Sequence, residues 1–220
     1  MDNRKAEKTA VPDTMPELTP DLLIGHGRHK ECYRYPGRPD LCIKVAYNEG
    51  GTTDLVREIR YLKTLSGSNL DYSVLPAYYG TVETSKGTGY VYELITDYNG
   101  DNCITVQDIL KDTPLLEKNF DRLVDDLKLL HRNLLDNRII TMGLFPENII
   151  VQRTDPHRTR LRIVNDMGSS TLIHLDYYIS ALARKHIEKR WQRFTQNLVK
   201  HHYDGRFPSP LVLELAEKIR

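Results

Sequence analysis

The chain has 220 residues, and 40% of them are hydrophobic, which is enough to bury a sizeable core in one domain or in two small lobes. Its 31 Lys and Arg residues nearly balance its 30 Asp and Glu residues, so the net charge gives no general attraction to nucleic acid or to anionic lipid. No apolar stretch approaches the ~18 residues of a membrane span, and the N-terminal MDNRKAEKTAVPDTMPELTP lacks the apolar region of a secretory signal. We therefore expect a cytoplasmic protein without a membrane or nucleic-acid partner.

The N-terminal region predicts a flexible tail followed by an antiparallel sheet. Residues 1–17 are polar and show no periodicity, so we expect the fold to begin near Leu18. The segment DLLIGHGRHKECYRYPGRPDLCIKVAY alternates apolar runs with Gly and Pro turns, which predicts three antiparallel strands, the last over residues 41–46.

A helix and two more strands complete this first lobe. Leu55, Ile59, Leu62 and Leu65 recur at helical spacing within DLVREIRYLKTL, which predicts an amphipathic helix. The following YYGTVETSKGTGYVYELI predicts strands over residues 79–83 and 89–95 around a Gly-containing turn. Residues 18–96 are therefore predicted to form a lobe of five strands and one helix.

Helices dominate the remaining residues, 97–220. Periodic apolar residues predict helices at about 105–111 and 115–136, and two short strands are expected at 148–152 and 161–164. LDYYISALARKHIEKRWQRFTQNLVKHH predicts a long basic C-terminal helix with Trp191 on its apolar stripe. The fold class is α+β, with a sheet lobe followed by a mostly helical lobe.

A glycine loop is the first candidate for phosphate binding. Gly25 and Gly27 lie in a strand-turn-strand segment whose backbone could approach phosphates, although a lone G-x-G is more often a simple hairpin turn. His26, His29 and Cys32 are spaced like metal ligands in the same loop, but they lack a clear fourth ligand.

Lys44 and Glu58 are the second candidate pair. Lys44 interrupts an otherwise apolar strand, a costly position unless its ammonium group meets an anion. The alternative is a lysine on an edge strand that reaches water. Glu58, 14 residues later on the predicted helix, could supply a counter-charge, or it could be an ordinary surface residue.

Asn148 and Asp166 are oxygen donors at the ends of two short strands. Together they could hold Mg²⁺ against phosphate oxygens, or each could simply satisfy a turn. The order along the chain favours the first interpretation: glycine loop, strand lysine, helix glutamate, hairpin, helices, P-E-N and D-x-G.

In this order the chain resembles the protein-kinase fold, from about Leu22 to Gly168. GHG resembles the glycine-rich loop, CIK resembles the A-I-K triplet, and REIRYL resembles the helix with the pairing glutamate. The resemblance implies ATP and Mg²⁺ as ligands. It also implies that Cys32 and Cys42 sandwich the adenine and that the backbone near Glu93 and Ile95 contacts it.

More closely, four stretches resemble the bacterial PhoP-regulatory-network protein YrbL family. They are GHGRHKECY, CIKV, GTVETSKGTGYVYELI and DNRIITMGLFPEN. The family carries a kinase-like fold, and its name implies a link to magnesium-responsive and acid-responsive regulation without indicating a substrate.

The sequence also departs from the kinase pattern at sites that matter for catalysis. Thr141-Met142-Gly143 replaces H-R-D, so Gly143 stands where the catalytic Asp is expected. Phe145 replaces the usual Lys or Ala, and Lys30 replaces the third loop glycine. No A-P-E follows Asp166, and only about 50 residues remain, which implies a shortened helical lobe.

Three classes of function remain open. The first is a pseudokinase or very slow kinase with a regulatory role, because the general base is missing. The second is an active atypical phosphotransferase on a small-molecule or protein acceptor, because phosphoryl transfer depends mainly on positioning and charge neutralisation. The third is an interaction module with a vestigial site, which would bind a protein partner through the basic C-terminal helix and Trp191.

Overall fold

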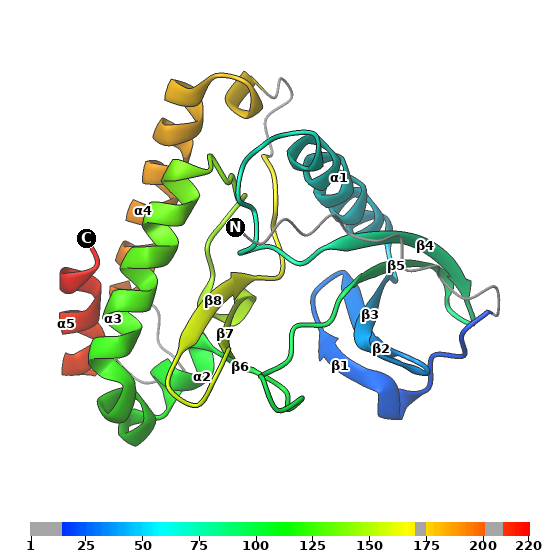
Figure 1. Cartoon of the computed structure of the whole chain (residues 1–220), viewed down its shortest axis with the longest axis horizontal. Helices are drawn as coiled ribbons and strands as arrows, with labels where there is room; N and C mark the ends of the chain where they lie inside the picture. The colour runs from blue at the N-terminus through cyan, green and yellow to red at the C-terminus, as the bar shows by residue number, and fades with distance from the viewer. Residues whose placement is uncertain (1–14, 170–174, 201–208) are drawn as a thin grey trace. The chain divides into compact units, whose positions relative to one another are not determined.

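The computed structural model describes residues 15–169, 175–200 and 209–220 (Figure 1). These residues fall into two compact units. The first contains the described residues up to Leu62 together with Pro76–Ile95, and the second contains Lys63–Leu75 together with the described residues from Thr96 onward.

The first unit is built on a five-stranded antiparallel sheet with the strand order β1-β2-β3-β5-β4. Its elements are the 3-10 helix η1 (Pro20–Leu22), β1 (Leu23–His26), β2 (Lys30–Tyr35), β3 (Arg38–Ala46), α1 (Glu49–Ser66), β4 (Tyr78–Thr84) and β5 (Gly87–Glu93). The prediction of an α+β chain with five antiparallel strands is confirmed. Strand β3 is central, so Lys44 does not lie on an edge strand.

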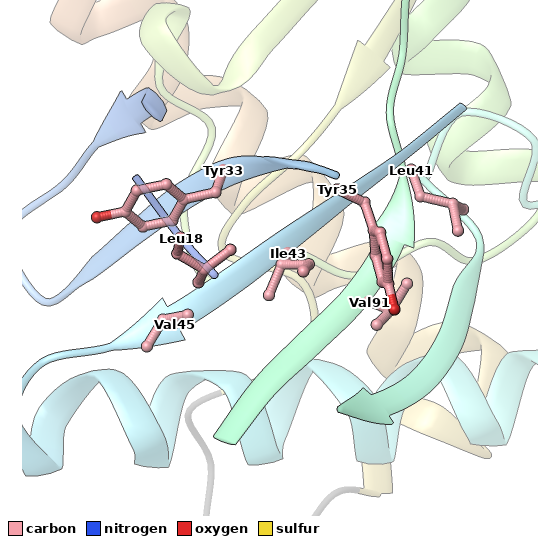
Figure 2. Packing of buried hydrophobic residues seen from close by; sticks show 7 residues of the cluster. All are labelled: Leu18, Tyr33, Tyr35, Leu41, Ile43, Val45 and Val91. Carbon is pink, nitrogen blue, oxygen red and sulfur yellow. The ribbon is translucent and has the colours of Figure 1, made fainter. Parts of the chain in front are cut away.

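The two faces of this sheet differ in chemistry because side chains alternate along each strand. One face carries the apolar cluster shown in Figure 2, in which Leu18 from the preceding segment packs with side chains of β2, β3 and β5. The buried members are Leu18, Tyr33, Tyr35, Leu41, Ile43, Val45 and Val91. The strand register places Cys32, Cys42 and Lys44 on the opposite face.

Helix α1 lies on the Lys44 side of the sheet, where its Glu58 meets Lys44 of β3. It begins at Glu49, earlier than the predicted periodic stretch at residue 54, because Asn48 Oδ1 accepts a hydrogen bond from Gly51 N at 3.0 Å and starts the helix. A side chain at residue 51 would not fit, since an added Cβ would lie 2.2 Å from the carbonyl oxygen of His29. Gly51 therefore lets α1 approach the β1–β2 loop closely, and this approach positions Glu58.

The tail prediction needs a correction at its C-terminal end. Residues 1–14 lie outside the described residues, but Pro16 is buried and its carbonyl accepts a hydrogen bond from Ser85 N at 3.2 Å. Leu18 N donates to Ser85 Oγ at 2.9 Å. The chain is thus held against the β4–β5 turn two residues before the predicted start of the fold.

The second unit combines helices with a three-stranded sheet in the order β6-β7-β8. Its elements are β6 (Ile104–Thr105), α2 (Val106–Lys111), α3 (Thr113–Asp136), η2 (Pro146–Asn148), β7 (Ile149–Arg153), β8 (Thr159–Ile163), η3 (Leu175–Tyr177), α4 (Ser180–Lys200) and α5 (Pro210–Lys218). Strand β6 and helix α5 were not predicted from the sequence. Asn148, expected as the first residue of a strand, ends the 3-10 turn before β7.

Helices α3, α4 and α5 pack side by side (Figure 1). Trp191 lies between them at 2% exposure, stacked on His131 with ring centroids 4.3 Å apart, and its Nε1 donates to Ile219 O at 2.8 Å. Trp191 is therefore part of the core and not of an exposed surface, while a protein partner for the basic C-terminal helix stays a prediction. The last residues of the predicted C-terminal helix, His201 and His202, lie outside the described residues.

Residues 63–75 belong to the second unit although they precede β4. Val74 O accepts a hydrogen bond from Ile163 N at 2.8 Å, and Asn137 Oδ1 accepts one from Asp71 N at 2.9 Å. The predicted lobe 18–96 is therefore interrupted, because residues 63–75 belong to the second unit. Within the described ranges, no helix is long and apolar enough to cross a membrane.

Candidate functional site

Lys44 is buried on the central strand of the first unit. Only 6% of the residue is exposed, and its Nζ lies 3.4 Å from Glu58 Oε2 and 4.5 Å from the centroid of the Tyr92 ring. A buried ammonium group is stable only with hydrogen-bonded or electrostatic partners. The structure therefore brings together Lys44 and Glu58, as the sequence order suggested.

Glu58 is fully buried, and its charge is maintained by two lysines. Burial by itself raises the pKa of this carboxyl, but the ammonium groups of Lys44 and Lys30 outweigh that effect and hold its pKa below the ordinary value. The carboxylate form is thus favoured in the folded protein.

Lys30 is the residue that sequence reasoning missed in this cluster. It was identified only as a replacement for a loop glycine, yet its Nζ lies 2.8 Å from Glu58 Oε1, closer than the Nζ of Lys44 lies to Oε2. The alternation of side chains along β2 could have identified Lys30, because Lys30 and Cys32 share one face of β2. The hairpin pairs Cys32 with Lys44, so all three side chains lie on the same face.

The glycine loop is a tight turn between β1 and β2. Gly27 N donates to Lys30 O at 2.9 Å, and Gly27 O accepts from the Tyr47 hydroxyl at 2.6 Å. Neither Gly25 nor Gly27 has a positive φ, so the backbone conformation does not require glycine at either position. A side chain at residue 27 would be crowded, because an added Cβ would lie 3.3 Å from Lys30 O.

Cys32 and Cys42 lie on the same sheet face as Lys44 and interact with each other. A hydrogen bond from the Cys42 thiol, followed by the charges of Lys44 and Lys30, lowers the pKa of Cys32 against the effect of burial. The same hydrogen bond, together with burial, raises the pKa of Cys42 well above its ordinary value.

Glu93 ends strand β5, and its backbone is engaged in the first unit. Its N donates to Ala77 O at 2.9 Å, and its carbonyl oxygen lies 3.7 Å from the Cys42 sulfur. Ile95 lies beyond the strand and is 5% exposed. The adenine contacts that the kinase resemblance implies for Glu93 and Ile95 stay a prediction.

Asn148 and Asp166 meet in the second unit. Asn148 Nδ2 donates to Asp166 Oδ2 at 2.7 Å, and Asn148 Oδ1 accepts from Asn165 at 3.3 Å. Asp166 has a φ of 60°, unusual for a residue other than glycine, and its carbonyl oxygen accepts from Met142 N at 2.7 Å. The backbone conformation at Asp166 is thus held by a hydrogen bond from a segment distant in the sequence.

Asn148 and Asp166 carry side-chain oxygens of the kind that Mg²⁺ uses. The ion commonly binds one or two protein oxygen ligands together with substrate phosphates, rather than a complete protein cage. Among the described residues, no group of three or more His, Cys, Asp and Glu side chains is arranged to hold a metal. Asn148 and Asp166 are the residues that would hold Mg²⁺, and magnesium binding by this pair stays a prediction.

Gly143 lies beneath an aromatic ring. A Cβ added at Gly143 would lie 2.4 Å from Phe145 Cε2, so the Phe145 ring occupies the space that a side chain at residue 143 would need. Phe145 is 39% exposed, and the clashing atoms lie at the far end of its flexible side chain. The two departures from the kinase pattern are thus neighbours, because the side chain at residue 145 fills the space next to residue 143.

Comparisons with known proteins agree with the resemblance to the YrbL family. The family model of the PhoP regulatory network protein YrbL matches residues 17–199. Uncharacterized protein YrbL of Escherichia coli (strain K12) is 37% identical over 182 residues, which cover 82% of this chain and 86% of that protein. The protein of the same name from Shigella flexneri shows the same identity and coverage. With most of its length matched, the chain belongs to the PhoP regulatory network protein YrbL family.

Proposed function

We propose that this chain is a kinase-like protein that binds ATP with Mg²⁺ and acts as a regulator with little or no phosphoryl transfer. The observation that carries the proposal is the buried pair of Lys44 and Glu58 on β3 and α1. Buried ion pairs contribute little net stability, so their presence favours a role in ligand binding. In kinases, a strand lysine held by a helix glutamate contacts the nucleotide phosphates.

Asn148 and Asp166 support the metal-binding part of the proposal. Their side chains lie 2.7 Å apart, and Asp166 is held in an uncommon backbone conformation, which is frequent at functional sites. In the kinase pattern these two residue types hold Mg²⁺ against the phosphates.

The regulatory part rests on the missing base and on the family. Gly143 offers no carboxylate, and loss of a positioned general base costs about 10²–10⁴-fold in rate. Membership of the PhoP regulatory network protein YrbL family is consistent with a regulatory role.

A slow atypical phosphotransferase is the second candidate. The contact between Asn148 and Asp166 favours it, because metal binding and positioning supply most of the catalysis of phosphoryl transfer. A purely interacting module ranks third. Its partner would contact the exposed basic residues of α4, including Arg184, Lys185 and Lys189, because Trp191 is buried.

The deciding experiment measures ATP binding by calorimetry and thermal unfolding, in Mg²⁺ and in EDTA. ATP at about 100 times its Kd should raise the free energy of unfolding by about 2.7 kcal/mol. Lys44→Met should abolish this effect, whereas Lys86→Met, at a largely exposed lysine of the same unit, should not. Asp166→Ala should remove the gain due to Mg²⁺. An unchanged unfolding temperature of the wild type at millimolar ATP would reject the proposal.

A further inference from the structure

Glu58 is shared between two lysines, and this arrangement is the basis for a further inference. Its Oε1 lies 2.8 Å from Lys30 Nζ, and its Oε2 lies 3.4 Å from Lys44 Nζ. A carboxylate can accept hydrogen bonds on both oxygens, so one glutamate can hold two ammonium groups at once. The three side chains form a compact cluster, defined here as the Lys30–Glu58–Lys44 cluster.

This cluster is buried and holds two ammonium groups around one carboxylate. The exposed fractions of the side chains are 11% for Lys30, 7% for Lys44 and 0% for Glu58. Two ammonium groups held this close together can donate hydrogen bonds to an anion with several oxygen atoms, such as a polyphosphate.

The backbone holds Lys30 in a fixed place at the end of the glycine loop. Lys30 O accepts from Gly27 N at 2.9 Å, and the neighbouring His29 O accepts from Tyr47 N at 3.2 Å. These backbone hydrogen bonds hold the loop in place, so the Lys30 side chain projects directly from its end.

We propose that Lys30 is a second phosphate-binding cation, which acts with Lys44 on the polyphosphate group of the nucleotide. This inference rests on the proposed function and deepens it. Lys30 would supply, at the glycine loop, a positive charge that a metal ion would otherwise provide. Part of the affinity for a triphosphate is then independent of Mg²⁺.

The test uses inorganic tripolyphosphate in EDTA, so that neither the base nor a metal contributes to binding. Isothermal titration of the full chain compares the wild type with Lys30→Gln, with Lys30→Arg, and with Lys86→Gln as the matched control. Lys86 loses the same charge near the same loop but pairs with Glu31 instead of Glu58. Lys30→Gln should weaken binding about tenfold or more, since a hydrogen bond to a charged group is lost. Lys30→Arg and Lys86→Gln should each stay within about twofold of the wild type.

A second measurement uses only the wild type, in case Lys30→Gln does not fold. Amine acetylation followed by peptide mass spectrometry should show slower labelling of Lys30 and Lys44 in tripolyphosphate, with Lys86 unaffected. Equal labelling of Lys30 with and without tripolyphosphate would overturn the inference, as would a folded Lys30→Gln variant with wild-type affinity.

The same variants titrated with ATP and Mg²⁺ separate this inference from the proposed function. If ATP binds the wild type and Lys30→Gln equally in both buffers, the role of Lys30 is rejected and nucleotide binding stands. If tripolyphosphate binds in a Lys30-dependent manner and ATP does not bind, the anion site stands and the proposed function fails.

Discussion

Replacing Glu58 by Gln should destabilise the first unit strongly. The substitution preserves the shape of the side chain but removes its charge, and it leaves the ammonium groups of Lys30 and Lys44 buried without their shared carboxylate. Breaking a buried ion pair on one side costs about 3–5 kcal/mol. With a urea dependence of about 2 kcal/mol per molar, the unfolding midpoint should fall by about 1.5–2.5 M.

Far-UV circular dichroism is the appropriate readout, because the sole tryptophan, Trp191, lies in the second unit. The matched control is Glu83→Gln, the same change at an exposed position of β4, which should cost less than about 0.5 kcal/mol. A Glu58→Gln variant with the wild-type midpoint would refute the electrostatic reasoning.

The effect of Glu58→Gln should also depend on pH, with a sign fixed by the lowered pKa. The pKa of Glu58 in the folded protein lies below its ordinary value of 4.5, so the charged form contributes stability that is fully present above that value. This contribution is lost as the pH falls through the folded pKa. The difference in unfolding free energy between wild type and variant should therefore shrink as the pH falls below about 4.5, and a difference that grows there would contradict the assignment.

Two further predictions concern thiol chemistry and the missing base. The pKa of Cys32 is lowered by its hydrogen bond with the Cys42 thiol and by nearby lysines, whereas burial raises the pKa of Cys103 to about 12. Iodoacetamide at neutral pH should therefore alkylate Cys32 before Cys103, and mass spectrometry can follow the order of labelling. Faster labelling of Cys103 would contradict this order. For the base, an Asp side chain at residue 143 needs the Phe145 ring to move, so Gly143→Asp should gain less phosphoryl transfer than Gly143→Asp combined with Phe145→Ala in a radiolabelled γ-phosphate assay. Equal inactivity of both variants would mean that the lost base is not the limiting defect.

The strands and helices of the first unit could be predicted from local patterns. Gly and Pro punctuated DLLIGHGRHKECYRYPGRPDLCIKVAY at its turns, and the period-two alternation along β2 and β3 separated the apolar cluster from the face of Lys44. The kinase-like order of motifs singled out Lys44 and Glu58 as a pair, and the structure places their charged groups 3.4 Å apart.

Other features depended on contacts between segments distant in the sequence. The close approach of α1 to His29 at Gly51 placed Glu58 within reach of Lys30, and no local pattern encodes such an approach. Likewise, Ile219 at the end of α5 accepts a hydrogen bond from Trp191 Nε1, so Trp191 became part of the core while the basic residues of α4 stayed exposed.

The sequence by itself determined the order of the elements, the faces of the strands and the candidate charges, because these follow from periodicity and from the conformational limits of Gly and Pro. Only the tertiary structure decided that Glu58 holds Lys30 as well as Lys44, and that Phe145 covers Gly143. The physical reason is that a salt bridge or a steric clash requires atoms to meet within a few ångströms, and chain periodicity fixes a direction but not a distance. The strand register and the docking of α1 supply that distance.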